Sequence, residues 1–584
     1  MPTTDRRQAL LRQIYPEPQA LATAERLTEL AEAWRPRLPR LDESAAALTE
    51  RDAVLITYGD QVQAPGEPPL QTLAEFCRRH LAGLITGVHV LPFFPWSSDD
   101  GFSVKDYRAV APELGGWEHI EMLGRTFRLM VDGVINHASA QGAWFQGFQR
   151  GDPAYQDFFI TVAGDPDLSQ VVRPRALPLL TEVQTAAGPR RVWTTFSADQ
   201  VDLNFANPAV LLEIADILLE YVARGAQFLR LDAIAYLWKE IGTNCLHRPQ
   251  THAVVQLLRA LLDDVAPHVR LITETNVPHA DNLSYFGDGA NEAHLVYNFA
   301  LPPLVLHALR TGETQALTTW AASLRLPSDG AAFFNFLASH DGVGLNPARG
   351  LLPAEALEAV AAGVLAHGGR ISYKHNADGT QSPYELNINY FDALSDPAGD
   401  EPLGTPVDRF MAAQAILLAL AGLPGIYFHS LFGSRGWPEG AALTGHNRTL
   451  NRQKLQRASL ERELADPASL RGKVFARYGR LLRARAASPA FQPQAGQRVI
   501  EAGPGVFAVL RTARTAPAAV LAVHNLTGRP RRLALPLPDL LGGESWAREL
   551  VTGRRVRLAR RAPLTLAPYA VVWLTGLGNK KAAR

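Results

Sequence analysis

The sequence has little cysteine, no long apolar run and almost no surplus of charge. Its two cysteines, Cys77 and Cys245, lie far apart and lack a metal-ligand spacing, so we expect free thiols in a reducing compartment. The absence of a run of about 18 apolar residues and of a signal-peptide pattern predicts a soluble, cytoplasmic protein without a membrane partner. A formal net charge of +1 gives no reason to expect a nucleic-acid partner either.

Short runs of strand-forming residues alternate with helix-like segments along most of the chain. At 584 residues, the chain is too long for a single core. The clearest helix covers 208–224, with Asn207 placed to cap it, Pro208 at its first position and Gly225 after its end. This alternation predicts an α/β fold with a parallel sheet, and eight strands predict a (β/α)8 TIM barrel. The expected strands are 54–60, 88–94, 128–136, 228–234, 270–276, 294–299, 333–341 and 425–430.

Several segments do not fit the rhythm of a barrel. Two connections are too long for simple barrel loops, and segments of that size are usually functional. The last part of the chain has short strand-like runs broken by Pro-Gly, Thr-Gly and Gly-Arg turns, which predicts a small all-β module. The expected domains are an N-terminal helical extension (1–50), the barrel (51–136 and 201–490), an inserted domain (137–200), an inserted loop domain (342–407) and a C-terminal β domain (491–577).

Acidic residues recur where the expected strands end. Arg230 and Asp232 stand two residues apart on the fourth strand, so both side chains face one side and the arginine would keep the carboxylate ionised. Taken alone, the two residues fit a structural ion pair equally well. Asp60 stands at the end of the first expected strand, Glu274 lies on the fifth and Asp341 on the seventh. Such a convergence of carboxylates is typical of glycoside chemistry.

A metal site is the rival interpretation of the acid cluster. Asp132, Asn136 and His137 lie together on and after the third strand. They lack the helical histidine pair of zinc enzymes, and the chain has no EF-hand spacing. We therefore expect neither a metal nor a cofactor.

Four segments, at 131–137, 228–233, 272–276 and 338–341, resemble the signature regions of the α-amylase superfamily, in order and on the expected strands. Further stretches resemble its sucrose phosphorylase branch. Within that branch, three segments look most similar to the glucosylglycerate phosphorylases. Sucrose phosphorylases differ at those three places and have Tyr-Gln where this chain has Tyr384-Glu385. The branch-specific stretches are 55–60, 88–94, 173–178, 242–245 and 301–304, and the three segments are 95–102, 272–279 and 382–387.

The resemblance implies roles for the acids and for the residues around them. Asp232 would be the nucleophile, Glu274 the general acid and then base, and Asp341 a third acid that binds sugar hydroxyls. The mechanism would be a retaining double displacement with carboxyls about 5–5.5 Å apart. The implied glucose contacts are Asp60, His89, His137, Arg230, His340 and Arg448, with Asp60 and Arg448 paired at the distal end of the ring.

The acceptor site is expected on the two long loops. Arg175 would receive phosphate or the acceptor, with Arg173 close by and with Tyr384 and Glu385 on the opposing loop. Tyr236 would line the entrance, and a packing role fits it equally well. The implied reaction is phosphorolysis of 2-O-α-glucosyl-glycerate to α-glucose 1-phosphate and glycerate, with only a sugar and inorganic phosphate as partners.

Alternatives to this function stay open at this stage. The enzymatic ones are sucrose phosphorylase, sucrose 6-phosphate phosphorylase, glucosylglycerol phosphorylase and an α-glucoside hydrolase of the same fold. The non-enzymatic one is an inactive carbohydrate-binding relative, against which the three acids argue. The oligomeric state is not fixed, and a homodimer is one expectation.

Overall fold

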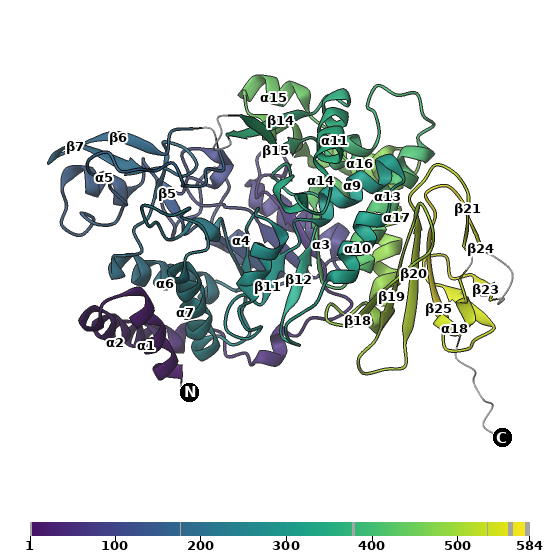
Figure 1. Ribbon diagram of the computed structural model, residues 1–584, viewed down its shortest axis with the longest axis horizontal. Coiled ribbons are helices and arrows are strands. Elements are labelled where there is room, and N and C mark those ends of the chain that lie inside the picture. Colours follow the sequence, from purple (N-terminus) through teal and green to yellow (C-terminus); the bar gives the residue numbers. More distant parts are fainter. Residues whose placement is uncertain (1–2, 176, 376–379, 534, 559–563, 578–584) are drawn as a thin grey trace.

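A closed barrel of eight parallel strands forms the centre of the molecule (Figure 1). The computed structural model describes residues 3–175, 177–375, 380–533, 535–558 and 564–577. Each barrel strand overlaps one of the eight expected strands, so the predicted (β/α)8 fold is confirmed. In their order around the barrel, the strands are β1 (Val54–Thr57), β16 (Leu423–Tyr427), β12 (Ala332–Asn335), β11 (Leu295–Tyr297), β10 (Arg270–Thr273), β9 (Ala226–Leu231), β4 (Arg128–Gly133) and β3 (Gly87–Val90).

Helices surround this barrel and cover the outer faces of its strands. The α6 helix begins as its sequence predicts, because the Asn207 side chain accepts a hydrogen bond from the Ala209 amide at 3.0 Å. The larger helices are α3 (Pro69–Leu81), α4 (Trp117–Gly124), α6 (Pro208–Ala223), α7 (Pro249–Val265), α9 (Leu301–Thr311), α10 (Gln315–Ser323), α13 (Gly404–Ala419) and α17 (Leu470–Ala486). Shorter ones are α8 (His279–Leu283), α14 (Phe428–Leu431), α15 (Pro438–Thr444) and α16 (Arg457–Ala465).

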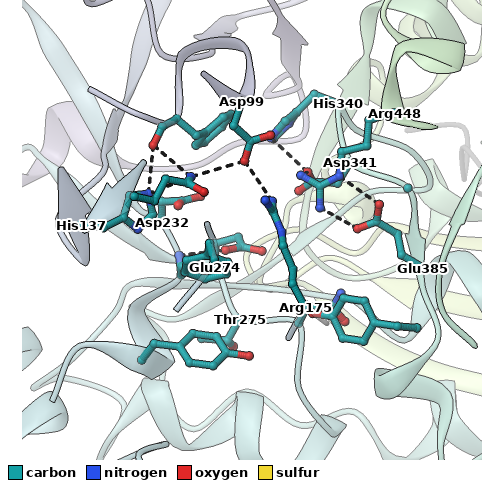
Figure 2. Close-up of a pocket in the computed structure, with 18 of the residues that line it drawn as sticks. Asp99, His137, Arg175, Asp232, Glu274, Thr275, His340, Asp341, Glu385 and Arg448 are labelled. Atoms are coloured by element: carbon teal, nitrogen blue, oxygen red, sulfur yellow. Dashed lines mark hydrogen bonds and ion pairs between the residues drawn. The ribbon is translucent and has the colours of Figure 1, made fainter. Parts of the chain in front are cut away.

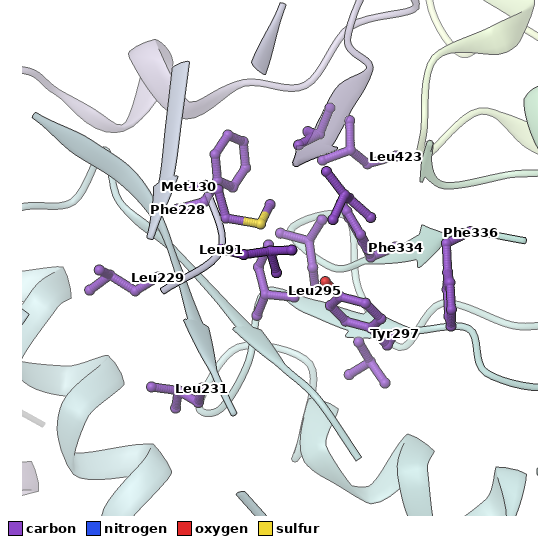
Figure 3. Close-up of a cluster of buried hydrophobic side chains, with 14 of the residues drawn as sticks. Leu91, Met130, Phe228, Leu229, Leu231, Leu295, Tyr297, Phe334, Phe336 and Leu423 are labelled. Carbon is purple, nitrogen blue, oxygen red and sulfur yellow. The ribbon is translucent and has the colours of Figure 1, made fainter. Parts of the chain in front are cut away.

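The alternation of side chains along β9 separates the packing face from the chemical face. Figure 3 shows buried side chains from several barrel strands, among them Met130, Phe228 and Leu295, packed together in the core. Leu229 and Leu231 point to the opposite side of β9 from Phe228 and Arg230. The strand therefore buries leucines under the helices and carries Arg230 on the face that continues to Asp232.

Two insertions extend from the barrel between strands and helices. The first, between β4 and α6, contains β5 (His137–Ser139), α5 (Ala143–Arg150), β6 (Leu180–Thr185), β7 (Gly188–Trp193) and β8 (Gln200–Asp202). The second, between β12 and α13, contains β13 (Val343–Gly344), α11 (Ala354–Ala366), β14 (Arg370–His375), β15 (Gln381–Asn387) and α12 (Tyr390–Leu394). Antiparallel pairing joins β5 to β8, β6 to β7, and β15 to both β13 and β14. A short parallel pair, β2 (Val62–Gln63) with β17 (Leu455–Gln456), lies outside both insertions.

The N-terminal helices α1 (Thr3–Ile14) and α2 (Glu17–Trp34) pack against α7 and α6. Three polar contacts fix them: Arg7 with Asp264 at 3.2 Å, Tyr15 with the Phe205 carbonyl at 2.9 Å, and Trp34 with Asp216 at 2.6 Å. No helix in the described part of the chain combines the length and apolarity that a membrane crossing requires.

The C-terminal module lies at the other end of the long axis from the N-terminal helices (Figure 1). Its apolar cluster, which includes Leu521, Val523 and Leu574, is separate from the main core. Its six-stranded sheet has the order β18 (Gly496–Ile500), β19 (Val506–Thr512), β20 (Ala519–Asn525), β25 (Val571–Gly576), β22 (Trp546–Glu549) and β23 (Arg555–Arg557). A second pair, β21 (Arg531–Leu533) and β24 (Leu564–Leu566), and the short helix α18 (Leu537–Leu540) complete it. The strands over 496–500, 555–557 and 564–566 were not expected from the sequence.

Candidate active site

A pocket opens at the carboxyl ends of the barrel strands (Figure 2). Asp232, Glu274 and Asp341 line it and follow β9, β10 and β12 in the chain. The ends of parallel strands meet at one end of a barrel, so acids from three separate strands converge there. Asp232 and Glu274 are each only 8% exposed, so keeping either carboxyl group ionised costs free energy because little water can solvate the charge.

The guanidinium of Arg230 lies beside the acids and contacts several carboxylates. Its Nη1 is 2.9 Å from Asp232 Oδ1 and also donates to Asp132 of β4. Its Nη2 lies farther, 3.8 Å, from Glu274 Oε2. The other oxygen of Asp132 is 2.7 Å from His89 Nε2. We expected His89 in the wall of the glucose site; instead, it is fully buried and supports Asp132, because its ring points into the barrel.

The two central acids titrate differently from the buried acid that shares Arg230. Burial raises the pKa of both Asp232 and Glu274, and Arg230 offsets that rise only in part. For Asp132, burial also acts upward, but the nearby charges of His89 and Arg230 lower its pKa to about 2. Because the ionised Asp132 already neutralises part of the Arg230 charge, too little positive charge remains to keep both Asp232 and Glu274 ionised. The two acids therefore favour a state in which they hold one proton between them.

Arg448 fixes the third acid from the opposite side of the pocket. Its Nη1 lies 2.7 Å from Asp341 Oδ1, and its Nε and Nη2 reach the two oxygens of Glu385 at 2.9 and 2.7 Å. Although burial acts upward, Arg448 and other cations hold the pKa of Asp341 well below its ordinary value. The adjacent His340 stacks on Phe102 at 4.8 Å between ring centroids. Asp341 is therefore ionised and held in one orientation.

Asp99 contributes a further carboxylate to the pocket, and sequence reasoning did not single it out. Its Oδ2 is 2.9 Å from Arg175 Nη2, and the guanidinium of Arg175 also lies over the Phe196 ring at 5.6 Å. Burial opposes ionisation, but Arg175, Arg448 and Arg452 hold the pKa of Asp99 well below its ordinary value. Asp99 has a left-handed backbone, with φ 53°. Such strain in a non-glycine residue is found where the surroundings fix a functional side chain.

Two residues expected in the site lie outside it. Asp60 was expected to pair with Arg448, but its Oδ1 is 2.6 Å from Lys454 Nζ, because the β2–β17 pair brings the Lys454 segment against the turn after β1. Arg173 is not among the described residues that line the pocket, and its guanidinium donates to the Leu177 carbonyl. Of the two expected loop arginines, Arg175 alone reaches the pocket in this part of the structure.

Apart from the buried His89 and Arg230, which lie beneath the acids, the other expected residues line the pocket. His137 Nε2 lies 2.9 Å from the Phe102 carbonyl, and burial lowers the pKa of His137, which keeps the ring neutral. Tyr236 packs edge-to-face on Phe196 at 5.4 Å. Tyr384 comes from β15, beside Glu385. The two insertions therefore supply opposite parts of the pocket, as Arg175 belongs to the first and Tyr384 to the second.

A buried ammonium group occupies the junction between the first insertion and the barrel. Lys239 Nζ lies 2.9 Å from Asn136 Oδ1 and forms an ion pair with Asp202 of β8. Asp202 also accepts hydrogen bonds from Asn136 and from both the amide and the hydroxyl of Thr195. In the described part of the chain, no group of three or more His, Cys, Asp or Glu side chains could hold a metal ion. Lys239 supplies the positive charge at this junction.

Sequence reasoning missed Asp99, Lys239, Asp202, Gln200 and Phe196. The run Ser-Ser-Asp-Asp-Gly at 97–101 carried a usable signal, since acids before glycine in a turn tolerate left-handed backbone. The others carried none, because their positions depend on how the first insertion folds onto the barrel.

Comparison with known proteins agrees with this geometry. Residues 81–341 match the family model of the α-amylase catalytic domain. A glucosylglycerate phosphorylase from Spirochaeta thermophila is 51% identical over 99% of this chain and 100% of that protein. A sucrose phosphorylase from Agrobacterium vitis is 30% identical over 75% of this chain and 88% of that protein. The crystal structure of a sucrose 6F-phosphate phosphorylase from Thermoanaerobacter thermosaccharolyticum superposes with a TM-score of 0.72 at 22% identity, over 83% of this chain and 95% of that one.

The barrel and its acid cluster thus define an enzyme of the α-amylase type, with its site at the carboxyl ends of the strands. Within that class, the chain belongs to the family of glycoside phosphorylases that contains the glucosylglycerate phosphorylases and, as more distant relatives, the sucrose phosphorylases.

Proposed function

We propose that this enzyme catalyses the reversible phosphorolysis of 2-O-α-glucosyl-glycerate to α-glucose 1-phosphate and glycerate. The observation that carries the proposal is the 51% identity to a glucosylglycerate phosphorylase along the whole chain, against 30% over three quarters of it for a sucrose phosphorylase. The pocket supports it, because Arg175 places a guanidinium group there that the carboxylate of glycerate would bind.

The proposed chemistry is a double displacement that retains the configuration of the anomeric carbon. Asp232 attacks that carbon, and Glu274 protonates the leaving glycerate oxygen. The assignment rests on Arg230, which is closer to Asp232 (2.9 Å) than to Glu274 (3.8 Å) and so favours the negative charge on Asp232 and the shared proton on Glu274. In the second step, Glu274 takes a proton from phosphate as the phosphate oxygen attacks the glucosyl ester.

The glucose ring would lie between Asp341 and the two histidines. Asp341 is ionised and directed by Arg448, which suits binding to two adjacent sugar hydroxyls as positive charge develops on the ring. His137 is held by the Phe102 carbonyl, and His340 by stacking on Phe102. Asp99, beside Arg175, would mark the end of the glucose site in the place that we first gave to Asp60.

Arg175 would receive the anion in both directions of the reaction. Its side chain is 30% exposed and forms one ion pair, with Asp99, so an incoming anion competes with a single carboxylate. Glycerate and phosphate both offer two oxygens to a guanidinium fork. One arginine would therefore serve the acceptor in one half-reaction and phosphate in the other.

The test is the release of phosphate from α-glucose 1-phosphate with glycerate, glycerol, fructose or fructose 6-phosphate as acceptor. Glycerate should give the highest kcat/KM by a wide margin. A preference for glycerol would make this a glucosylglycerol phosphorylase, and one for fructose would assign it to the sucrose enzymes. Release of phosphate together with an equal amount of free glucose, whichever acceptor is present, would indicate a hydrolase. The proposed partners in the reaction itself are small molecules, and the two buried free cysteines support a cytoplasmic location.

A further inference from the structure

The net charge of the whole chain is close to zero, but the C-terminal segment is strongly basic and the rest of the chain is acidic. Residues 491–584 contain 15 of the 58 lysines and arginines but only 4 of the 57 aspartates and glutamates. That segment therefore has a formal net charge of +11, and residues 1–490 have −10. A basic module at the end of an acidic enzyme is a feature that the proposed reaction does not require, because the active site lies in the barrel.

Part of this charge is arranged on one face of an edge ladder. In the antiparallel pair of β22 and β23, Trp546 lies opposite Arg557, and Arg548 lies opposite Arg555. All four side chains are exposed, whereas Ala547 between them is buried. Since side chains alternate along a strand, the four share one face, with neighbours on a strand about 7 Å apart. We call this face, made of Trp546, Arg548, Arg555 and Arg557, the Trp–Arg face.

Among the described residues, no carboxylate pairs with the arginines of the Trp–Arg face. The acidic residue of β22, Glu549, is buried and accepts hydrogen bonds from the Val551 and Thr552 amides. Within the described ranges, none of the three arginines forms an ion pair. Like charges directly opposite each other in a ladder destabilise a sheet, so the Arg548–Arg555 pair works against folding. Local features that oppose stability in this way are expected where a surface serves a function.

The aromatic ring adds a second, independent element. Trp546 is 41% exposed, and the Arg555 guanidinium lies over its ring at 5.1 Å. Because β23 is the last strand of its sheet, the face lies at the edge of that sheet. Exposed Arg529, Arg532 and Arg554 lie in the neighbouring turn and strand segments, outside the face itself. Single-stranded nucleic acid offers regularly spaced phosphates, which guanidinium groups bind, and unpaired bases, which stack on an exposed aromatic ring.

We infer that the Trp–Arg face is a binding surface for single-stranded nucleic acid, with RNA as the ligand in the cell. Phosphodiester groups contact Arg548, Arg555 and Arg557, and a base stacks on Trp546. A bilayer fits the face less well, because insertion uses several apolar side chains and Trp546 is the one large exposed apolar residue among the described residues of the module. The inference departs from our first expectation, which rested on net charge averaged over the whole chain.

The experiment measures the anisotropy of a fluorescein-labelled 20-nucleotide oligo(U) titrated with the full-length protein at several salt concentrations. We expect measurable binding at 50 mM salt, with affinity falling as salt rises. A variant with Arg548→Gln, Arg555→Gln and Arg557→Gln should bind at least 10-fold more weakly and lose about 2 units of the log–log salt slope, since each phosphate contact contributes about 0.7. Trp546→Ala should weaken binding about fivefold or more with little change in that slope.

The matched control removes three exposed arginines from the rest of the molecule, as Arg51→Gln, Arg78→Gln and Arg150→Gln. The control should retain wild-type affinity for oligo(U), and both triple variants should keep wild-type phosphorylase activity. Equal losses in the two triple variants, or no binding at 50 mM salt, would overturn the inference. Binding to anionic phosphatidylglycerol vesicles in place of oligo(U) would assign the face to a membrane. If Arg548→Gln, Arg555→Gln and Arg557→Gln together change the molar mass of the protein in light scattering but leave its oligo(U) affinity intact, the face is an interface between copies of the chain.

Discussion

Replacing Arg175 tests whether one guanidinium selects a charged acceptor. Arg175→Ala should lower kcat/KM for glycerate more than kcat/KM for glycerol, which has a similar carbon frame without the carboxylate. The two acceptors share every other step, including the formation of the glucosyl-enzyme from α-glucose 1-phosphate. A loss of phosphate binding therefore affects both equally and cancels from their ratio.

The structure sets the size of the effect. A charge-assisted contact between arginine and carboxylate contributes about 1.5–3 kcal/mol. Arg175 must first leave Asp99, at 2.9 Å, and a partly exposed pair of that kind contributes about 0.5 kcal/mol. The net value of about 1–2.5 kcal/mol corresponds to a fall of about 5- to 70-fold in the glycerate-to-glycerol ratio. Arg175→Lys keeps the charge but loses the fork, and should give an intermediate ratio.

Initial rates of phosphate release at varied acceptor concentration give both values of kcat/KM. Arg173→Ala is the matched control, because Arg173 lies two residues away and contacts the Leu177 carbonyl outside the pocket. The reasoning fails if Arg175→Ala lowers both acceptors by the same factor, or if Arg173→Ala changes the ratio as much.

Three further sets of experiments test the assignments of the acids, of the pocket rim and of the buried lysine. Asp232→Asn should lose activity on every donor by several orders of magnitude, whereas Glu274→Gln should still form the glucosyl-enzyme from α-glucosyl fluoride. Glu274→Gln should also lose the alkaline limb of the pH profile, because burial raises the pKa of Glu274 and its protonated form is the active acid. Equal losses of Glu274→Gln on α-glucosyl fluoride and on the natural glucoside would contradict this. Asp99→Asn should lower kcat/KM by about 10-fold or more, because a charged contact in the site disappears. Asp60→Asn should change kcat/KM less than about threefold, because Asp60 pairs with Lys454 outside the pocket. A larger effect of Asp60→Asn than of Asp99→Asn in steady-state kinetics would restore Asp60 to the site. Lys239→Met should lower the free energy of unfolding by about 3–5 kcal/mol in urea denaturation, since it leaves Asp202 buried without its cation. A chelator should leave wild-type activity unchanged. Inactivation by the chelator that one divalent ion reverses would refute the expectation that no metal is needed.

Local patterns in the sequence were sufficient to predict the barrel. Each strand is a short apolar run with turn or helix signals on both sides, and the cap of α6 at Asn207 lies where its residue type predicts. The acids were accessible for the same reason: Asp232 and Glu274 directly follow strands, and a barrel brings all strand ends to one place.

Residues whose position depends on tertiary packing were not predictable in this way. Asp60 also follows a barrel strand, yet its turn is drawn to Lys454, nearly 400 positions along the chain, by a two-residue parallel pair. Asp99 reaches the pocket from a left-handed turn within the connection after β3, far from any regular strand end. The positions of strand ends therefore located the acids that line the centre of the pocket and misplaced a residue of its rim.

The pocket has an excess of carboxylates, and this excess bears on how an anionic substrate can react there. Its lining contains five carboxyl groups and two guanidinium groups, with Arg230 behind the pair of Asp232 and Glu274. An approaching phosphate adds negative charge, which raises the proton affinity of every nearby acid. In the proposed reaction, Glu274 would be ionised after it gives its proton to the departing glycerate. Its nearest guanidinium nitrogen, on Arg230, is 3.8 Å away, against 2.7–2.9 Å for the other four acids, so its proton affinity would rise most. If the proposed roles hold, entry of phosphate would strengthen Glu274 as the base that activates phosphate, and Arg175 would favour that entry by exchanging Asp99 for the incoming anion.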